Sequence, residues 1–292
     1  MAGTVAGQRR KNIGETVTIL QSLLLGLIQG LTEFVPVSST AHLLIAQNLL
    51  GLPANNAMFS FLVIVQLGTI VSLVIYFWKD LVKIVRLTIA SIPLLLKRKT
   101  GELDPDAQLG WFIVIATLPA LVAGYLLKDA VEALFKQPLL EAGIRLLITA
   151  IVLALAEGLG KRHHSLKSMK WYHALIIGCA QVLAVFPGAS RSGTTIAAGM
   201  ACRLHRPAAA RFAFLMAVPV MLAAGGYQML DVIKMADLGS FLPVLAIGFV
   251  TAAAVGWLAI RWLMKFLNKR SLLPFAWYCA ILGLVVLFIH VF

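Results

Sequence analysis

The chain alternates long apolar runs with short polar connections. Six of these runs are long enough to cross a hydrocarbon core of about 30 Å, and each predicts one membrane-spanning helix. They lie near residues 57–78, 109–128, 139–160, 210–230, 240–262 and 272–292. The pattern therefore predicts an all-α polytopic membrane protein with about six spans.

Two further apolar regions, 18–51 and 172–201, are interrupted near the middle by proline, serine and a charged residue. The interruptions read EFVPVSS at residues 33–39 and FPGASRS at residues 186–192. Each half of these regions is too short to cross a bilayer, and irregular backbone at membrane depth must be covered by protein or line a water-filled cavity. We therefore predict two re-entrant helix hairpins with functional tips.

The two interrupted regions resemble each other. Alignment of residues 29–34 with residues 181–186 brings Ser38 opposite Ser190 and Ser39 opposite Arg191. Each hairpin precedes three predicted spans, and an odd number of crossings inverts the second unit relative to the first. Such inverted repeats bring broken helices together near the bilayer midplane.

The predicted organisation follows from this repeat. It consists of an N-terminal tail over 1–17, a first repeat over 18–160, and a second, inverted repeat over 161–292. Each repeat holds one re-entrant hairpin and three spans. The two hairpins are expected to enter from opposite faces, so that their tips can meet.

Composition supports a lipid-embedded chain, since 60% of the residues are hydrophobic and 13% are charged. The formal net charge is +13, but lysine and arginine cluster between apolar runs, which indicates membrane flanks and not nucleic-acid binding. The three cysteines show neither paired spacing nor an even count, so they indicate neither a disulfide framework nor a zinc site.

The basic connections predict orientation. Lysine and arginine are abundant at 79–99, 161–170, 203–211 and 261–270, and such loops are typically cytoplasmic. The first hairpin would then enter from outside and the second from the cytoplasm, with both termini outside. The tail conflicts with this placement because it carries Arg9, Arg10 and Lys11. We keep the placement because the other basic loops agree with one another.

Polar groups at membrane depth are costly, so they are candidate functional residues. In the first hairpin, Gln29 and Glu33 are four residues apart and share one helix face. With substrate phosphate and water, their oxygens could hold a divalent cation. The alternative is a structural hydrogen bond that caps or joins helices.

Ser38, Ser39 and Thr40 follow at the predicted tip, and His42 comes one turn later. One of the hydroxyls is expected to cap the next helix. Together with Glu33, however, they supply a hydroxyl, an imidazole base and an acid, which are the parts of an activated nucleophile. A lone histidine in an apolar run is usually a core residue whose hydrogen bonds are satisfied within the protein. The neighbouring hydroxyls and carboxylate favour a functional role for His42.

The second tip predicts an anion site. Gly188 and Gly193 allow close backbone approach, and the helix that follows presents its N-terminal N–H groups. Arg191 adds donor geometry suited to phosphate. The surrounding hydroxyls belong to Ser190, Ser192, Thr194 and Thr195. Alternatively, Arg191 pairs with Glu33 only to hold the hairpins together.

The two tips together supply a carboxylate, an imidazole, hydroxyls, a guanidinium and a phosphate cradle. Phosphoryl transfer needs these groups. Because the site would lie at membrane depth, the substrate phosphate is expected to be attached to a lipid.

At these residues the chain resembles the BacA-type undecaprenyl-diphosphate phosphatase family, which is linked to bacitracin resistance. Gln29 and Glu33 match the family's Glu/Gln-x-x-x-Glu motif, and Ser39 and His42 follow as in the family. Residues 187–195 match its Pro-Gly-x-Ser-Arg-Ser-x-x-Thr motif. The resemblance covers nearly the whole chain after the tail.

The resemblance implies hydrolysis of undecaprenyl diphosphate to undecaprenyl phosphate and inorganic phosphate, helped by Mg²⁺ or Ca²⁺. This reaction would recycle the carrier lipid for peptidoglycan synthesis, at the bacterial inner membrane, with the site open toward the periplasm. The sequence leaves the oligomeric state open, homo-oligomers included.

The resemblance also implies residue roles. Glu33 would bind metal or act as base, and Ser39 or His42 would attack phosphorus, with the choice left open. Gln29 stands where some members have glutamate, which makes strong metal chelation by this pair less expected. The groups implied to hold the diphosphate include Ser190, Arg191, Ser192 and Thr195, together with Gln29, Ser38 and Gly188 beside them.

Two rival functions remain to be weighed. A transporter or flippase for an anionic lipid could share the inverted repeat, although it has little use for Ser39 and His42 beside Glu33. The PAP2-type lipid phosphatases need a histidine six residues after the arginine, where this chain has Ala197. Separately, Arg145 and Glu157 either form a structural pair or face the cavity, and we expect the structural pair.

Overall fold

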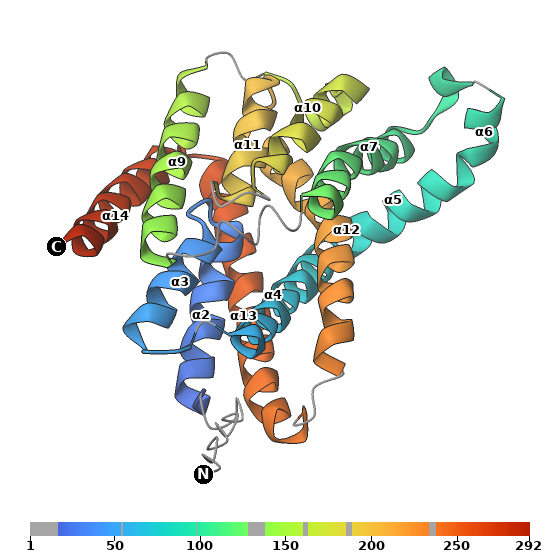
Figure 1. The fold of residues 1–292 in the computed structure, drawn as a ribbon. Helices are drawn as coiled ribbons and strands as arrows, with labels where there is room; N and C mark the ends of the chain where they lie inside the picture. Colours follow the sequence, from blue (N-terminus) through green and yellow to red (C-terminus); the bar gives the residue numbers. More distant parts are fainter. Residues whose placement is uncertain are drawn as a thin grey trace, which may run out of the picture.

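The computed structural model describes residues 17–53, 55–97, 99–127, 138–159, 163–184, 189–233 and 238–292. Over these residues the chain is helical apart from turns and one isolated backbone bridge, between His164 and Leu204 (Figure 1). Six helices are long and apolar enough to cross a membrane, which confirms the predicted all-α fold with six spans. They are α4 (Asn56–Tyr76), α7 (Pro105–Leu126), α9 (Pro138–Gly158), α12 (Arg206–Ile233), α13 (Leu238–Leu267) and α14 (Leu273–Val291).

The two interrupted regions form pairs of shorter helices. The first pair is α2 (Ile19–Phe34) and α3 (Ser39–Leu49), and the second is α10 (Trp171–Val182) and α11 (Arg191–Ala201). At about 1.5 Å per residue, the longest of the four reaches roughly 24 Å, less than the thickness of about 30 Å that a span must cross. The helix breaks therefore fall where proline, serine and charge predicted them.

Two of the predicted features lie outside the described residues. These are the N-terminal tail with Arg9, Arg10 and Lys11, and residues 185–188 with Pro187 and Gly188. The described part of the second tip begins at Ala189.

Close packing at two glycines positions the hairpins. Gly26 of α2 lies against Gly248 of α13, where an added Cβ would stand 2.6 Å from the Gly248 carbonyl oxygen. Gly178 of α10 lies against Ala116 of α7 in the same manner. Small residues let helix backbones approach closely in membranes. The helices thus pack as α2 on α13 and α10 on α7, while α4 packs on α12 and α9 on α14.

The basic connection at residues 79–99 differs from the expected loop. Much of it is helical, in α5 (Trp78–Ala90) and α6 (Ile92–Leu96), followed by a 3₁₀ turn. Helix α5 packs against α7 and is tied down by ion pairs of Lys83 with Asp106 at 2.5 Å and of Asp80 with Arg211 at 2.9 Å. These charges lie on exposed faces, so a high density of lysine and arginine does not prevent a helix.

The expected pair of Arg145 and Glu157 is wrong. The two residues are twelve positions apart on α9, which places them roughly 18 Å apart along the axis. Glu157 instead accepts two hydrogen bonds from Arg206, at 2.8 and 2.6 Å, and one from the backbone N–H of Leu272 at 2.7 Å. This carboxylate therefore joins α9, the start of α12 and the start of α14.

Candidate active site

The last two turns of α2 carry the predicted carboxylate. Gln29 and Glu33 lie on one buried face, and the Gln29 amide nitrogen donates to Glu33 Oε2 over 2.8 Å. Phe34 is buried edge-on against Phe214 of α12, with ring centroids 5.5 Å apart, and fixes the end of the helix. The Glu33 side chain is only 4% exposed, so its charge must be balanced inside the protein.

The turn after α2 brings a hydroxyl to this carboxylate. Ser38 has φ +69°, a left-handed conformation that non-glycine residues rarely adopt, and such strain is found mainly at functional sites. The reversal places Ser39, the first residue of α3, so that its hydroxyl donates to Glu33 Oε2 over 2.6 Å. The Ser38 side chain makes no capping hydrogen bond to α3, and Thr40 is exposed.

His42 is not hydrogen-bonded to Ser39. Its Nδ1 lies 2.9 Å from the Ser38 carbonyl oxygen and its Nε2 lies 2.8 Å from the hydroxyl of Tyr278, on α14. A carbonyl oxygen can only accept, so the network assigns the proton to Nδ1 and leaves Nε2 to accept from Tyr278. The two rings are also stacked, 5.7 Å apart and 8° from parallel. Both ring nitrogens are therefore occupied.

The second tip starts α11 with a cap of hydroxyls. Ser190 Oγ accepts the backbone N–H of Gly193 over 3.1 Å and lies 3.2 Å from Ser192 Oγ. The Ser190 N–H donates to Thr149 Oγ1 of α9 over 3.0 Å. Ser190 thus takes the capping role that the first tip lacks. The capped helix start, with its N-terminal N–H groups, is suited to an anion.

Arg191 joins the two tips. One of its terminal nitrogens, Nη2, donates to Glu33 Oε1, while the other, Nη1, is buried and has no hydrogen-bond partner among the described residues. The two tips therefore meet as predicted, and Nη1 is left as an unsatisfied donor within the described part of the chain. A buried donor of this kind favours an anionic ligand, since leaving it unpaired is costly.

The remaining hydroxyls of the second tip face their own helix. Thr194 Oγ1 donates to the Ser190 carbonyl over 2.7 Å, and Thr195 Oγ1 donates to the Arg191 carbonyl over 2.8 Å. The structure thus brings together Gln29, Glu33, Ser39 and Arg191 by direct hydrogen bonds. Gly188 lies outside the described residues.

Three residues near the site were not predicted. Tyr278 and Thr149 come from spans far along the chain and hold His42 and Ser190. Gln181 on α10 is buried, and neither its amide oxygen nor its amide nitrogen has a hydrogen-bond partner among the described residues. The alignment of the two hairpins could have indicated Gln181, because it lies opposite Gln29.

The described residues supply few metal ligands. Among them, no three side chains of His, Cys, Asp or Glu gather into a group that could hold a metal ion. Glu33 is the carboxylate of the cluster, and Gln29 lies on the same helix face with its amide nitrogen directed at Glu33. Mg²⁺ needs no complete protein cage when a substrate supplies phosphate oxygens, so this ligand set fits a cation that is held largely by the substrate.

The fold and the site define a multi-pass helical membrane protein in which two broken-helix regions join a carboxylate, a serine hydroxyl and a guanidinium. The model of the family described as bacitracin resistance protein BacA matches residues 22–285, and this chain belongs to that family.

Curated relatives match over most of their length. A protein of Pseudarthrobacter chlorophenolicus is 40% identical over 265 residues, covering 90% of this chain and 94% of the relative. One of Methanosphaera stadtmanae is 39% identical over 279 residues, covering 94% and 98%. Both are named undecaprenyl-diphosphatase.

Proposed function

We propose that this protein hydrolyses undecaprenyl diphosphate to undecaprenyl phosphate and inorganic phosphate. Family membership and the name shared by its relatives support this activity. The observation that carries it is the Glu33 carboxylate, which accepts the Ser39 hydroxyl and pairs with Arg191 at the same time. A nucleophile, its base and a phosphate-binding cation thus lie within one hydrogen-bonded cluster.

Ser39 is the proposed nucleophile. Its Oγ would attack the terminal phosphorus while Glu33 Oε2, 2.6 Å away, takes the hydroxyl proton. The anhydride bond to the lipid-bearing phosphate breaks, and undecaprenyl phosphate leaves. Water then hydrolyses the phosphoserine and releases inorganic phosphate. His42 is the weaker candidate because both its nitrogens are engaged away from Ser39.

Arg191 and the start of α11 would bind the reacting phosphate. Arg191 Nη1 offers a donor without a protein partner, and Ser190 and Ser192 place two hydroxyls beside it in sequence. Charge that develops on the phosphoryl oxygens would be stabilised by these donors. Gln29 would orient Glu33 through its 2.8 Å hydrogen bond.

A divalent cation, Mg²⁺ or Ca²⁺, is part of the proposal. Glu33 and the Gln29 amide oxygen would contribute hard oxygen ligands, and the diphosphate would contribute the others. When bound, the cation would neutralise charge on the diphosphate. Because the Gln29–Glu33 pair contains one carboxylate, most of the affinity for the cation would come from the bound diphosphate.

The proposed architecture is an inverted repeat of a re-entrant hairpin plus three spans, over residues 18–160 and 161–292. The short helices α2, α3, α10 and α11 support the re-entrant arrangement. The equivalent packing of Gly26 and Gly178, which are 152 positions apart like Ser38 and Ser190, supports the repeat. The basic connections favour an inner-membrane orientation with the site open to the periplasm.

Phosphate release from undecaprenyl diphosphate by the purified full-length protein tests the function. We expect release that requires a divalent cation and stops with EDTA, and a loss of about 10³-fold in Ser39→Ala. Thr40→Ala, which removes the neighbouring exposed hydroxyl, is the matched control. Binding of the lipid without release under Mg²⁺, Ca²⁺ or Mn²⁺ would instead favour the transporter.

The nucleophile needs a separate test. Acid quenching of the enzyme with substrate labelled at the terminal phosphate is expected to trap label on Ser39, located by peptide mapping. Label on His42 would replace Ser39 as the nucleophile. Turnover without any trapped label, in a variant slow enough to detect it, would favour direct attack by a Glu33-activated water.

A further inference from the structure

The outer ends of the first hairpin carry neutral capping residues. Thr18 precedes α2, and its hydroxyl accepts the backbone N–H of Gln21 over 3.2 Å. Gly51 follows α3 with φ +62°, and its N–H donates to the Asn48 carbonyl. Leu52 N–H then returns to the Gln47 carbonyl. This bond pattern is the Schellman motif, in which glycine is the usual residue.

The second hairpin carries cationic residues at the corresponding two positions, and the Lys170 side chain makes no capping hydrogen bond. Lys170, 152 positions after Thr18, precedes α10, and Arg203, 152 positions after Gly51, follows α11. Arg203 has φ +66°, donates to the Met200 carbonyl over 2.9 Å, and is followed by the Leu204 bond to the Gly199 carbonyl. An arginine at φ +66° is strained by comparison with glycine. Positively charged side chains thus occupy both positions, although they suit the local backbone less well than threonine and glycine do.

These two cations lie at one cavity of about 530 Å³, at the outer end of α10 and α11. Its lining includes His164, His173, Lys170 and Arg203, and none of the described residues that line it is a carboxylate. Within the described part of the chain, neither Lys170 nor Arg203 has an acidic partner. We call this the basal cavity. Its charge is therefore uncompensated by the described protein.

The histidines of the basal cavity also offer donors. His173 Nδ1 accepts the backbone N–H of Lys170 over 3.2 Å, which leaves Nε2 as the protonated nitrogen. His164 Nδ1 is buried and has no hydrogen-bond partner in the part of the chain that the structure describes. Burial lowers the pKa of His173, and electrostatic repulsion from the neighbouring His164 and Lys170 lowers it further. An anion would relieve this repulsion.

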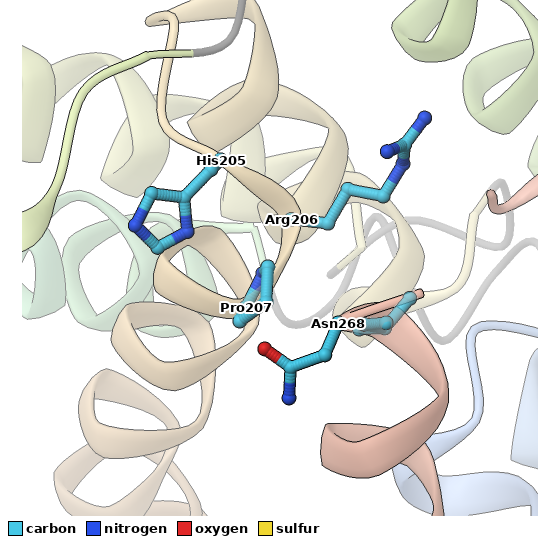
Figure 2. A pocket seen from close by; sticks show the side chains of 5 residues that line it. His205, Arg206, Pro207 and Asn268 are labelled. Carbon is cyan, nitrogen blue, oxygen red and sulfur yellow. The ribbon is translucent and has the colours of Figure 1, made fainter. Parts of the chain in front are cut away.

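A neighbouring cavity provides a contrast. It measures about 300 Å³ and is lined by His205, Arg206, Pro207, Leu267 and Asn268 (Figure 2). Its arginine, Arg206, is bound to Glu157, and His205 Nδ1 accepts the Ala208 N–H. Both basic side chains of this cavity thus have a partner within the protein. Of the two cavities, the basal cavity is the one whose cations lack acidic partners among the described residues.

The surroundings of the basal cavity suit a membrane surface. Trp171 and Tyr172 at the start of α10 are 59% and 39% exposed, and Ile176 one turn later is 49% exposed. Tryptophan and tyrosine collect at the level of lipid headgroups. The cavity is thus expected where a lipid phosphate can reach it.

We propose that the basal cavity is an anion site for a phosphate group, either that of an anionic phospholipid or free phosphate. Lys170, Arg203 and His173 Nε2 would donate to the phosphate oxygens, with the N-terminus of α10 beside them. Helix α11 spans roughly 16 Å between Arg203 and Arg191, so this site is separate from the candidate active site. The proposal does not depend on hydrolysis.

Native mass spectrometry of the full-length protein, released from detergent and titrated with short-chain phosphatidic acid, tests the proposal. Arg203→Gly is the informative variant, since glycine suits the φ of this position and keeps the cap. We expect the first binding event to weaken by about tenfold, with no lower melting temperature. Arg270→Gly, which removes an exposed arginine after α13, should change affinity less than about twofold.

Equal weakening in Arg203→Gly and Arg270→Gly would overturn the proposal, because it would indicate diffuse attraction to a basic surface. No preference of the wild type for phosphatidic acid over phosphatidylcholine, with no competition from inorganic phosphate, would also overturn it. Displacement of the lipid by millimolar inorganic phosphate assigns the site to the phosphate group alone. Retained lipid binding under the same conditions assigns it to a lipid phosphate.

Discussion

The two hairpins share a framework and divide the chemistry. Helices α3 and α11 each have 11 residues and begin 152 positions apart, yet one starts beside Glu33 and the other begins with Arg191. The first tip supplies a carboxylate and a hydroxyl, and the second supplies a guanidinium and a hydroxyl-capped helix start. In the proposed repeat, a site of opposite charges thus requires that the two halves differ in sequence.

In the proposed mechanism, the Glu33–Arg191 pair both holds the two tips together and takes part in the reaction. Removing one partner of a buried ion pair costs about 3–5 kcal/mol, since the other charge is left unpaired. Loss of activity in a single variant therefore cannot separate a holding role from a catalytic one. Experiments that change the two tips in concert can separate them.

The largest expected effect comes from exchanging the two charges. In Glu33→Arg combined with Arg191→Glu, the pair can form again, so we expect thermal unfolding to recover relative to either single variant. Ser39 would then face a guanidinium that cannot accept its proton, and phosphate release should stay about 10³-fold below wild type. Recovery of release together with stability would show that the pair only holds the hairpins together.

A smaller effect is expected from Arg191→Lys. The charge remains, but a lysine cannot pair with Glu33 and offer a second planar donor to phosphate at once. We expect release at saturating substrate to fall by about 10²-fold, measured beside circular dichroism to confirm folding. Arg211→Lys, in an exposed pair with Asp80, serves as the control and should remain near wild type.

The packing glycines test whether the two hairpins are held equivalently. Gly26→Ala and Gly178→Ala should each lower the free energy of unfolding by about 1–3 kcal/mol, because the added methyl group meets backbone of the neighbouring span. Gly124→Ala, whose Cβ would meet no atom within 4 Å, should not destabilise. A loss at only one of the two positions would show that the hairpins are supported differently.

The smallest effect is expected at Tyr278. Tyr278→Phe keeps the ring stacked on His42 but removes the hydroxyl that donates to Nε2. Loss of one neutral hydrogen bond corresponds to a change of about 2- to 10-fold, which we expect in the turnover rate rather than in the Michaelis constant. A loss as large as that of Ser39→Ala would mean that the hydroxyl touches the substrate.

The spans and hairpin breaks could be predicted because their signals are local. Long apolar runs and the strings at residues 33–39 and 186–192 determine what each segment can do in a bilayer. Helix α5 was missed because a high density of cations was taken for a loop, whereas its charges lie on exposed helix faces. The local sequence pattern was therefore sufficient to predict the structure of apolar segments but not that of basic segments.

Contacts between distant segments could not be predicted in the same manner. Tyr278 lies 236 positions from His42, and no periodicity indicates their contact. The Arg145 and Glu157 expectation failed because Glu157 found a partner 49 positions away, on another helix. Lys170 and Arg203 could be counted as loop charges, but their capping positions became visible only when the two hairpins were compared.

The ion pair between the hairpins also constrains how the chain is made. Glu33 and Arg191 are 158 positions apart, so at about 5–20 residues per second the carboxylate is synthesised roughly 8–30 s before its partner. During that interval an ionised carboxylate within the hydrocarbon would be costly, which favours its protonated form or a position near water. The Glu33 carboxylate can therefore lie buried and ionised only after ribosomal synthesis has delivered Arg191.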